Sequence, residues 1–410
     1  MINIMSRISQ LTDEYKRNIE LNGKNLIIVG NNGSGKTLFL RALNEHLSEI
    51  VREQYVTTIA EMEKKLNEHT SAVKNFQVDT DGYNSFMSSV IGIKARLEKK
   101  KKYDVVFAST TDIVNRLRKN QFILKFFKAN REFVSSDENH LTSVENLYKT
   151  FNSSTVNEQN TSNYFESYLV SISNYALLEK GAGEIDEYNR VNFILNSIQA
   201  DLCDLFEDND LILRFNRKKL KMEIIQKNKI PFGLDELPSG FASILAVYAE
   251  LIMLSELSKQ DKNEVTGIVL IDEIDAHLHV TLQKKVFNFF ANSFPNIQFV
   301  ISTHSPFVVQ SVSDAIIYNL SNNEQMEDLS IYSYSSIVKG LLGEATNSDD
   351  LEGLLAEVGV LSKSNDFGNR FDEIMEILES KVNVLDPRAK AIYLGAKSRM
   401  VDWREGEQNV

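Results

Sequence analysis

The chain has 410 residues, a formal net charge of −12 at pH 7 and a single cysteine, Cys203. The negative charge argues against a generally basic coat for nucleic acid, although local basic patches remain compatible with it. The lone cysteine excludes a disulfide framework and a cysteine-based zinc site, and it fits a cytosolic setting. No apolar run reaches the ~18 residues that a membrane span needs, and no signal peptide is recognised. We therefore expect a soluble, cytoplasmic protein without a membrane partner.

A phosphate-binding loop is predicted near the N-terminus. Residues 26–29, Leu-Ile-Ile-Val, indicate a strand, and residues 30–37, Gly-Asn-Asn-Gly-Ser-Gly-Lys-Thr, fit the pattern G-x-x-x-x-G-K-[ST]. The apolar spacing of Leu38, Leu40 and Leu43 predicts a helix directly after the loop. Glycines let backbone N–H groups approach phosphate oxygens, and the helix N-terminus adds a favourable dipole. Eight matched positions between a strand and a helix favour this interpretation over a glycine-rich turn without a ligand.

The loop supplies a set of expected nucleotide contacts. They are Asn31, Asn32, Gly33, Ser34, Gly35, Lys36 and Thr37. Lys36 is expected to reach the β- and γ-phosphates, and Thr37 to coordinate Mg²⁺.

Beyond the loop, the helical period runs from Leu43 through Leu47 and Ile59 to Leu66. It predicts one long amphipathic helix that is packed rather than free, or that forms the base of a short coiled-coil arm. Positive charge is concentrated in residues 93–102, Ile-Lys-Ala-Arg-Leu-Glu-Lys-Lys-Lys-Lys. We interpret this run as a solvated helix end or loop, with a DNA-backbone contact as the alternative.

Residues 103–107 and 122–127 are predicted strands. The region 132–206 is Asn- and Ser-rich around residues 152–163 and then helical in pattern, so we expect a helical insertion there. Residues 211–215 and 221–225 predict a hairpin with basic residues between and along its strands: Arg217, Lys218, Lys219 and Lys221. The preceding Asp-Asn-Asp at 208–210 resembles a metal-binding D-x-D, but turn formation before a strand explains it better.

Residues 237–240, Leu-Pro-Ser-Gly, precede an apolar helix that is expected from Ala242 to Leu254. A serine and a glycine at a helix N-terminus place a hydroxyl and backbone N–H groups where a phosphate can bind. Ser239 and Gly240 are therefore candidate nucleotide contacts, with an ordinary helix cap as the alternative.

Two short apolar segments, residues 267–271 and 299–301, lead into polar residues that do not suit a core. This is typical of buried parallel strands that deliver chemistry at their C-terminal ends. Asp272 and Glu273 are adjacent, and adjacent side chains on a strand point to opposite faces. One can face a metal shell, as expected of Asp272, and the other a water. His304, after the second segment, can hydrogen-bond a phosphate or that water. The set suits phosphoryl transfer.

After a strand-like run at 314–318 and an apolar run at 334–342, residues 349–410 are charged and helical in pattern. Leucines at 351–355 and Ile374, Ile377 and Leu378 predict two amphipathic helices, which suit docking as well as local packing. The expected fold class is α/β. The expected domains are a discontinuous head (1–131 and 207–345), a helical insertion (132–206) and a C-terminal helical region (346–410).

Taken together, the segments 30–37, 237–240, 272–275 and 304 resemble an ABC-type P-loop ATPase head. Within that class they are similar to the SMC, RecF and OLD-like ATPases of DNA repair and anti-phage defence. The wording Asp-Glu-x-Asp-x-His-Leu-His at 272–279, with Ser-Thr-His-Ser-Pro at 302–306, is most like OLD-related ATPases. These include the ATPase subunit of Septu-type and retron-associated systems. The sequence departs from the family at Phe241, where a polar residue is usual.

The resemblance implies an ATP hydrolase that requires Mg²⁺ and works as a head-to-head dimer or higher oligomer. Glu273 would polarise the attacking water, His304 would position it, and Asp272 and Thr37 would hold the metal. Ser239, Gly240 and the loop with Asp275 would meet the nucleotide across the interface. His277 and His279 belong to the same loop, and we interpret them as part of this interface rather than as metal ligands. Two further residues are considered. Arg131 is interpreted as a surface arginine, with a phosphate or switch contact as the alternative, and Gln121 is a candidate for sensing Mg²⁺ that nothing in its spacing singles out.

Two functions remain compatible with these motifs. The chain would be the sensor and regulator of an anti-phage complex with a separate nuclease, of HNH type by the Septu resemblance, and would have no nuclease activity itself. Alternatively, it would be a DNA repair or recombination ATPase that binds DNA directly. DNA or RNA is a candidate partner in either case. A transporter subunit is disfavoured by the helical insertions.

Overall fold

The structure is a computed structural model that describes residues 4–134, 160–329, 349–382 and 387–407, with a few single positions between these ranges. The chain divides into two compact units, residues 1–342 and 343–410, which we describe separately. Most of the apolar run predicted at 334–342 and most of the Asn- and Ser-rich stretch at 152–163 lie outside the described residues.

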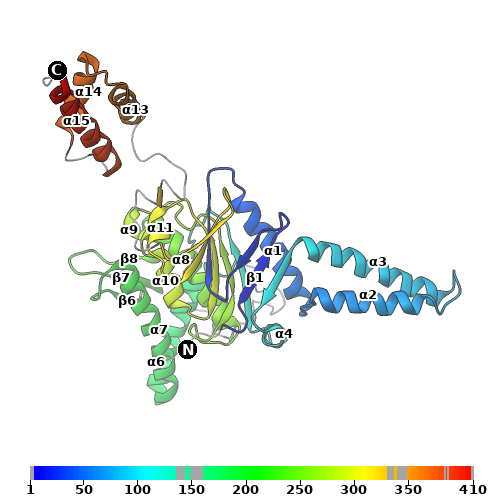
Figure 1. Ribbon diagram of the computed structural model, residues 1–410. Coiled ribbons are helices and arrows are strands. Elements are labelled where there is room, and N and C mark those ends of the chain that lie inside the picture. Colours follow the sequence, from blue (N-terminus) through cyan, green and yellow to red (C-terminus); the bar gives the residue numbers. More distant parts are fainter. Residues whose placement is uncertain are drawn as a thin grey trace. The chain divides into compact units, whose positions relative to one another are not determined.

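A six-stranded sheet forms the centre of the first unit (Figure 1). Its strands, in spatial order, are β12 (Glu324–Glu327), β11 (Ala315–Asn319), β3 (Asn25–Val29), β10 (Ile297–Ser302), β9 (Thr266–Ile271) and β5 (Phe122–Phe127). All neighbours are parallel except the edge strand β12, which pairs with β11 in the antiparallel sense. The strands predicted at 26–29, 122–127, 267–271, 299–301 and 314–318 are confirmed, and so is the α/β fold class.

The central sheet is buried on both faces, because successive side chains alternate between two hydrophobic cores. Along β3, Leu26 and Ile28 enter one core, whereas Ile27 and Val29 enter the other. Full burial of such side chains stabilises the fold by about 1.5–3 kcal/mol each. This double burial explains why the parallel strands are continuous apolar runs in the sequence.

One face of the sheet is covered by a three-stranded antiparallel sheet and two helices. The small sheet has the order β2-β1-β4. These elements are β1 (Ile8–Thr12), β2 (Asn18–Glu20), β4 (Asp104–Phe107), α1 (Lys36–Glu53) and α4 (Thr110–Arg118). Their apolar residues share a core with Leu26 and Ile28 of β3.

The opposite face is covered by helices and by a second antiparallel sheet of order β6-β7-β8. The elements on this side are η1 (Ser162–Tyr164), α6 (Phe165–Ala182), α7 (Ile185–Phe206), β6 (Ile212–Asn216), β7 (Lys221–Ile225), β8 (Phe232–Gly233), η2 (Leu234–Glu236), α8 (Ser239–Leu257), α9 (Val280–Gln283), α10 (Val286–Ser293) and α11 (Pro306–Gln310). The predicted hairpin at 211–225 is confirmed as β6 and β7. Asp208 makes the expected turn, since its Oδ1 accepts a hydrogen bond of 3.0 Å from the N–H of Asp210.

The expectation of one long helix from Leu43 to Leu66 was wrong. Helix α1 ends at Glu53, Gln54 adopts a left-handed backbone, and a new helix starts after Thr58. Thr58 and Glu61 form a reciprocal capping box, a start signal that the apolar period alone conceals. Helices α2 (Ile59–Val73) and α3 (Asp81–Lys102) then run side by side as a hairpin that extends outward from the sheet (Figure 1).

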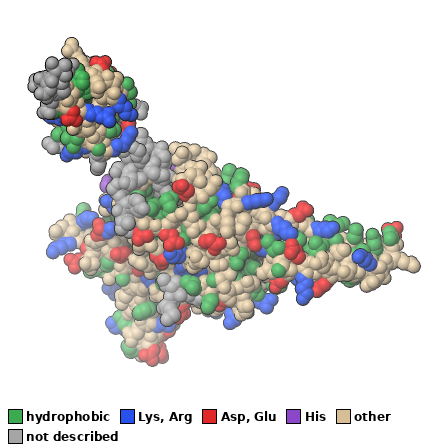
Figure 2. All heavy atoms as spheres, viewed as in Figure 1, with side chains coloured by type: hydrophobic (Ala, Val, Ile, Leu, Met, Phe, Trp, Pro, Cys, Tyr) green, Lys and Arg blue, Asp and Glu red, His purple; other side chains and the backbone are tan. Residues whose placement is uncertain are grey.

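The basic run at 93–102 is the last part of α3, as expected for a helix end. Several of its cations have acidic partners: Lys99 with Glu49 at 2.5 Å, Lys100 with Asp104 at 2.5 Å, Lys101 with Glu63 at 2.7 Å and Arg96 with Glu53 at 3.9 Å. Acidic and basic side chains therefore alternate over this region rather than forming a single-sign surface (Figure 2).

By length and composition alone, helix α8 could cross a membrane. However, 78% of its 18-residue apolar stretch is buried in this fold. It is the central helix of the core beneath the sheet. Its one fully buried charge, Glu250, forms an ion pair with Lys125 of β5 at 2.6 Å. The same carboxylate accepts hydrogen bonds of 2.6 Å from the N–H groups of Thr161 and Ser162. A polar junction thus links β5, α8 and the start of the α6–α7 pair.

The second unit contains helices α13 (Asp349–Lys363), α14 (Asn369–Ser380) and α15 (Pro387–Glu407), packed around their own small core. The two predicted amphipathic helices correspond to α13 and α14, with Leu355, Ile374 and Leu378 buried as expected. The third helix, α15, completes that core with Tyr393 and Ala396.

Candidate active site

The parallel register of three neighbouring strands brings distant segments of the chain to one edge of the sheet. Strand β10 lies between β3 and β9, with Ser302 level with Ile28 and Ile301 level with Ile271. The residues that follow these strands are the phosphate loop after β3, Asp272 after β9, and Thr303 and His304 after β10. The structure therefore places the loop, the carboxylates and the histidine at the same edge.

The phosphate loop occupies residues 30–35, between β3 and the first turn of α1. Gly30 has a φ of 143°, and a Cβ there would lie 2.8 Å from the Ser34 Oγ, so only glycine fits. Gly35 has a φ of 92°, and no atom lies within 4 Å of a Cβ added at this position, so this side of the loop is open. Left-handed glycines that turn backbone N–H groups toward open space are the arrangement that binds phosphate at a helix start.

Lys36 is the only residue of the predicted loop contacts whose side chain is deeply buried, with 6% of its surface exposed. Its ammonium donates hydrogen bonds to the carbonyl oxygens of Gly30 at 2.8 Å and Asn31 at 3.1 Å. Burial lowers the pKa of Lys36, and the nearby charges of Glu273, Asp272 and Asp275 oppose that shift. The lysine therefore faces the carboxylates that the sequence placed on a different strand.

Asp272 and Glu273 are held in distinct environments by Ser302. The Ser302 hydroxyl donates to Asp272 Oδ1 at 2.6 Å and accepts from the Glu273 N–H at 2.8 Å. Asp272 is 4% exposed, whereas Glu273 is half-buried. We predicted that strand alternation points the two acidic side chains to opposite faces. This reason was wrong, because β9 ends at Ile271 and neither acid lies on the strand. Glu273 lies beyond the strand with a left-handed φ of 44°, and that backbone directs its side chain.

A second hydroxyl, that of Thr303, connects the same strand ends. It donates to Asp275 Oδ1 at 2.5 Å, while the Thr303 N–H donates to the Ile28 carbonyl at 3.1 Å. The Ile274 N–H donates to the carbonyl of Ser302 at 3.0 Å. The hydroxyl side chains at the end of β10 and directly after it therefore fix the loop after β9 relative to the phosphate loop after β3.

Arg131 supports this loop from the other side. Its guanidinium donates to the carbonyl oxygens of Asp272 at 2.6 Å, Glu273 at 3.0 Å and Ile274 at 3.4 Å. Burial lowers the pKa of Arg131 to about 10, although the charges of Asp275, Asp272 and Glu273 oppose the shift. The side chain is thus not a free surface arginine, because three backbone carbonyl oxygens accept its hydrogen bonds. It holds the backbone that carries the two acids.

Gln121 was a wrong candidate for sensing Mg²⁺. It precedes β5, and Phe122 is level with Thr266 at the start of β9, so Gln121 lies at the opposite edge of the sheet from the phosphate loop. Its carbonyl accepts a hydrogen bond from Thr266 Oγ1 at 3.1 Å. The residues that follow β5 at the correct edge are those at 128–131.

The histidines differ in their surroundings. His304 is half-buried two residues beyond β10, and His277 is exposed. His279 caps α9, because its Nδ1 accepts a hydrogen bond of 3.5 Å from the Thr281 N–H. Within the described part of the chain, no group of three or more His, Cys, Asp or Glu residues could hold a metal ion.

Ser239 starts α8 and is exposed, whereas Gly240 is buried. A Cβ at Gly240 would lie 3.3 Å from the His277 carbonyl and 3.2 Å from Leu282 Cδ1, so glycine permits the close approach of α8 to the loop at 275–279. Phe241 stacks on Phe206, the last residue of α7, with ring centroids 4.4 Å apart. Phe241, which replaces the polar residue usual in the family, thus has a packing role.

A pocket of ≈ 200 Å³ adjoins the phosphate loop and was not predicted from the sequence. Its lining includes Ser34 of the phosphate loop, Leu38 in the first turn of α1, Tyr15 and Arg17 from the loop between β1 and β2, and Tyr103. The Arg17 guanidinium lies 4.8 Å from the centre of the exposed Tyr15 ring. In the sequence, the only indication of this pocket was Tyr15 close to Arg17, at a turn before the phosphate loop. The contribution of Tyr103 becomes visible only in the fold.

Comparison with known proteins identifies the family of the chain. Residues 26–310 match the family described as "AAA domain, putative AbiEii toxin, Type IV TA system". The chain belongs to this AAA family. The matched region begins within β3 and ends with α11, so it contains every strand end described above.

Individual relatives of this AAA-family chain match shorter segments. A protein described as "Retron Ec83 probable ATPase" from Escherichia coli is 36% identical over 118 residues, which are 28% of this chain and 22% of that protein. A "Septu protein PtuA" from Bacillus mycoides is 35% identical over 94 residues, or 23% of this chain and 13% of that protein. The predicted resemblance to ATPases of retron-associated and Septu-type systems is confirmed, over less than a quarter of each relative's length.

Among solved structures, an SMC head bound to the C-winged helix domain of ScpA aligns with 76% of this AAA-family chain and 94% of its own chain. The sequence identity is 14% and the TM-score is 0.35.

We expect Arg131→Gln to lower the rate of ATP hydrolysis by about 10- to 100-fold, because hydrogen bonds to a charged donor contribute about 1.5–3 kcal/mol and here fix the loop that carries Glu273. Nucleotide affinity should change less than about threefold, since Lys36 and the phosphate loop are untouched. Steady-state kinetics and nucleotide titration measure the two effects. Arg118→Gln, an exposed arginine at the end of α4, is the matched control. Equal turnover in both variants would contradict the role assigned to Arg131.

Proposed function

We propose that this chain is a Mg²⁺-dependent ATP hydrolase whose ATP-driven dimerisation switches a separate effector in anti-phage defence. The observation that carries the proposal is the meeting of Lys36, Asp272, Glu273 and His304 at one edge of the sheet, through the register of β3, β10 and β9. Membership of the AAA family supports nucleotide binding at this edge.

The residues present fit a nucleotide and a divalent cation. The loop offers backbone N–H groups on an open side, and Lys36 supplies a buried cation for the β- and γ-phosphates. The Thr37 hydroxyl and the Asp272 oxygen that Ser302 does not occupy are hard oxygen ligands of the kind that Mg²⁺ prefers. When bound, Mg²⁺ would neutralise charge on the phosphate oxygens.

Each side chain then has a separate task in hydrolysis. Glu273, less buried than Asp272 and held by the Ser302 and Arg131 contacts to its backbone, polarises the attacking water. His304 positions that water or the γ-phosphate. Lys36 stabilises the negative charge that the leaving phosphate develops. The pocket at Tyr15 and Arg17 holds the base of the nucleotide, with the ring and the guanidinium as stacking partners.

The dimer would be formed by the surface around Ser239. Ser239 is exposed, and the close packing of Gly240 against the His277 carbonyl makes the start of α8 and the loop at 275–279 one continuous surface. In a head-to-head dimer, Ser239, Gly240 and the loop with Asp275 of one subunit would contact the nucleotide on the phosphate loop of the other. ATP would hold the subunits together and hydrolysis would release them.

The effector is proposed to be a separate nuclease, of HNH type, in a cytoplasmic complex. The similarity to ATPases of retron-associated and Septu-type systems supports this assignment. The C-terminal unit is a candidate docking module, because α13 to α15 form their own core and leave apolar side chains such as Val360 and Leu394 exposed.

Glu273→Gln should retain ATP binding while hydrolysis falls at least ~10²-fold, the scale of a lost general base. Lys36→Ala should instead weaken nucleotide binding, because it removes the cation that faces the phosphates. Phosphate release and nucleotide titration separate the two outcomes. Glu264→Gln, at the opposite end of β9, is the control and should behave as wild type. Wild-type turnover in Glu273→Gln would remove this residue from the catalytic assignment.

Ser239→Arg should block ATP-dependent dimerisation in sizing experiments while leaving nucleotide binding to a single subunit intact, because the added bulk lies on the proposed interface. Mixed with Lys36→Ala protein, it should restore one composite site, with the phosphate loop of the first variant and Ser239 of the second. Ser85→Arg, an exposed position on α3, controls for the added charge. Unchanged ATP-dependent association of Ser239→Arg would overturn the shared-site arrangement.

The purified chain should hydrolyse ATP yet leave DNA and RNA intact in Mg²⁺ and Mn²⁺, since its strongest acidic pair, Asp272 and Glu273, is assigned to ATP. Cleavage should appear when the nuclease that co-purifies from native cells is added. Incubation of labelled substrates with and without that partner measures this. Cutting by the isolated chain that survives Glu273→Gln but is abolished by acidic substitutions elsewhere would contradict the proposal of a separate nuclease.

A further inference from the structure

A short stretch of this acidic protein carries a dense positive charge. Residues 214–221, Arg-Phe-Asn-Arg-Lys-Lys-Leu-Lys, contain five basic side chains and no acidic one, a net charge of +5 in eight residues. Because the whole chain has a net charge of −12, the remainder carries −17. These residues form the turn between β6 and β7 and the strand ends on either side of it.

The β6-β7-β8 sheet presents its basic face away from the core. One face of this sheet packs against the hydrophobic core. Its side chains are those of Leu213, Phe215, Met222, Ile224 and Phe232. The strand alternation sends Arg214, Asn216 and Lys221 to the other face. The polar face of this sheet is therefore outside the hydrophobic core.

The turn itself is ordered by its own hydrogen bonds. Asn216 Oδ1 accepts from the N–H groups of Lys218 at 3.1 Å and Lys219 at 3.2 Å, and Leu220 closes the turn with a left-handed φ of 52°. The side chains of Arg217, Lys218 and Lys219 are exposed at its tip. A preformed turn reduces the conformational entropy that would be lost when these cations bind a partner.

Acidic neighbours compensate only part of this charge. Glu223 pairs with Arg214 at 2.7 Å and with Lys219 at 3.2 Å, and the Arg214 and Asn216 hydrogen bonds hold the pKa of Glu223 at about 2. Lys221 pairs with Asp235 at 3.0 Å. Among the described residues, no acidic side chain lies within ion-pair distance of Arg217 or Lys218.

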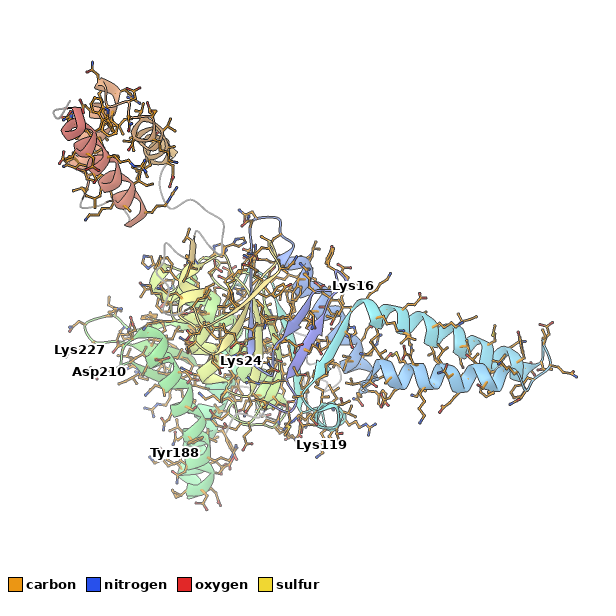
Figure 3. All side chains as sticks on the ribbon, in the orientation of Figure 1. Lys16, Lys24, Lys119, Tyr188, Asp210 and Lys227 are labelled. Atoms are coloured by element: carbon orange, nitrogen blue, oxygen red, sulfur yellow. The ribbon has the colours of Figure 1, made fainter. Side chains whose placement is uncertain are left out.

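The basic run on α3 gives an internal comparison. Four of its cations, Arg96, Lys99, Lys100 and Lys101, each have an acidic partner on α1, α2 or β4. The β6–β7 turn thus retains an excess of positive charge that the longer run at 93–102 largely loses. Lys227, on the next turn of the same sheet, lies at the end of the first unit away from the α2–α3 hairpin (Figure 3).

We infer that the β6–β7 turn is a contact surface for the phosphate backbone of double-stranded DNA. Clustered Lys and Arg side chains bind phosphates by neutralising charge and releasing counterions. Strand β8 pairs only with Glu223 and Ile224 of β7, so the hairpin is two-stranded next to the turn. A two-stranded hairpin end fits the wide major groove of B-form DNA, whereas the narrow major groove of A-form RNA excludes it. The charge complementarity and the ribbon shape together favour a DNA duplex over RNA or an acidic protein. This inference does not depend on ATP hydrolysis.

The test measures binding of a fluorescent 20-base-pair DNA duplex to the full chain by anisotropy, without nucleotide and over a range of salt concentrations. The triple variant Arg217→Gln, Lys218→Gln, Lys219→Gln should bind at least about 10-fold more weakly at low salt. The slope of log affinity against log salt should fall by about 2–3, at ~0.9 per lost phosphate contact. Asp235→Asn, which frees Lys221, should strengthen binding, and this gain cannot arise from misfolding.

The matched control is the triple variant Arg96→Gln, Lys99→Gln, Lys101→Gln, which removes the same charge from α3 and should retain most of the affinity. An RNA duplex and a single strand of the same sequence should bind more weakly than the DNA duplex. The inference is overturned if the wild type does not bind the duplex at low salt, if the two triple variants lose affinity equally, or if RNA binds as well as DNA. The turn variant should hydrolyse ATP at the wild-type rate when no DNA is present. A loss of DNA binding in this variant is then distinguishable from a failure of the proposed ATP hydrolysis.

Discussion

The parallel register of β3, β10 and β9 is the constraint on which the candidate site depends. A shift of one residue in any of these strands would exchange the two cores on the faces of the sheet, because Leu26 and Ile28 alternate with Ile27 and Val29. The same shift would move Asp272 or His304 away from the phosphate loop. Hydrophobic burial therefore fixes the position of polar groups that contribute little to folding themselves.

Two hydroxyl side chains and one arginine complete the site that the strand register brings together. Ser302 ends the middle strand of the three and Thr303 follows it, and each hydroxyl donates to an acid on the neighbouring loop. Arg131 reaches the same loop from beyond β5. Arg131 contacts only backbone carbonyl oxygens of this loop, and the hydroxyls are neutral donors, which leaves the Glu273 carboxylate free of an ion pair among the described residues.

The strands and the phosphate loop could be predicted because their signals are local. Residues 26–37 combine a strand, a glycine pattern and a helical period within a dozen positions, and the two later strands are continuous apolar runs. The break after Glu53 could not be seen from the apolar period, because a capping box at Thr58 restarts a helix in nearly the same phase. Gln121 was misplaced because a strand has two ends, and only the parallel direction of β5 decides which end faces the loop.

Contacts between distant residues were beyond sequence reasoning. The contact of Arg131 with three carbonyl oxygens uses backbone atoms, which any sequence supplies, so no residue pattern reveals it. The pocket at Tyr15 likewise joins a turn near the N-terminus to Tyr103 at the end of α3. Domain limits and the roles of Ser239 and His304 stay predictions.

The left-handed backbone of Glu273 means that the catalytic role proposed for this side chain comes with backbone strain at the same position. A φ of 44° costs a non-glycine residue on the order of 1 kcal/mol, and glycine would adopt it without strain. Selection for stability alone would therefore replace this acid with glycine, and so would a design method that scores only the backbone. The chain keeps glutamate there at an energetic cost, and the surrounding serine and arginine contacts make that cost tolerable. Efforts to stabilise proteins of this architecture should leave this position unchanged, even where every structural criterion favours a smaller residue.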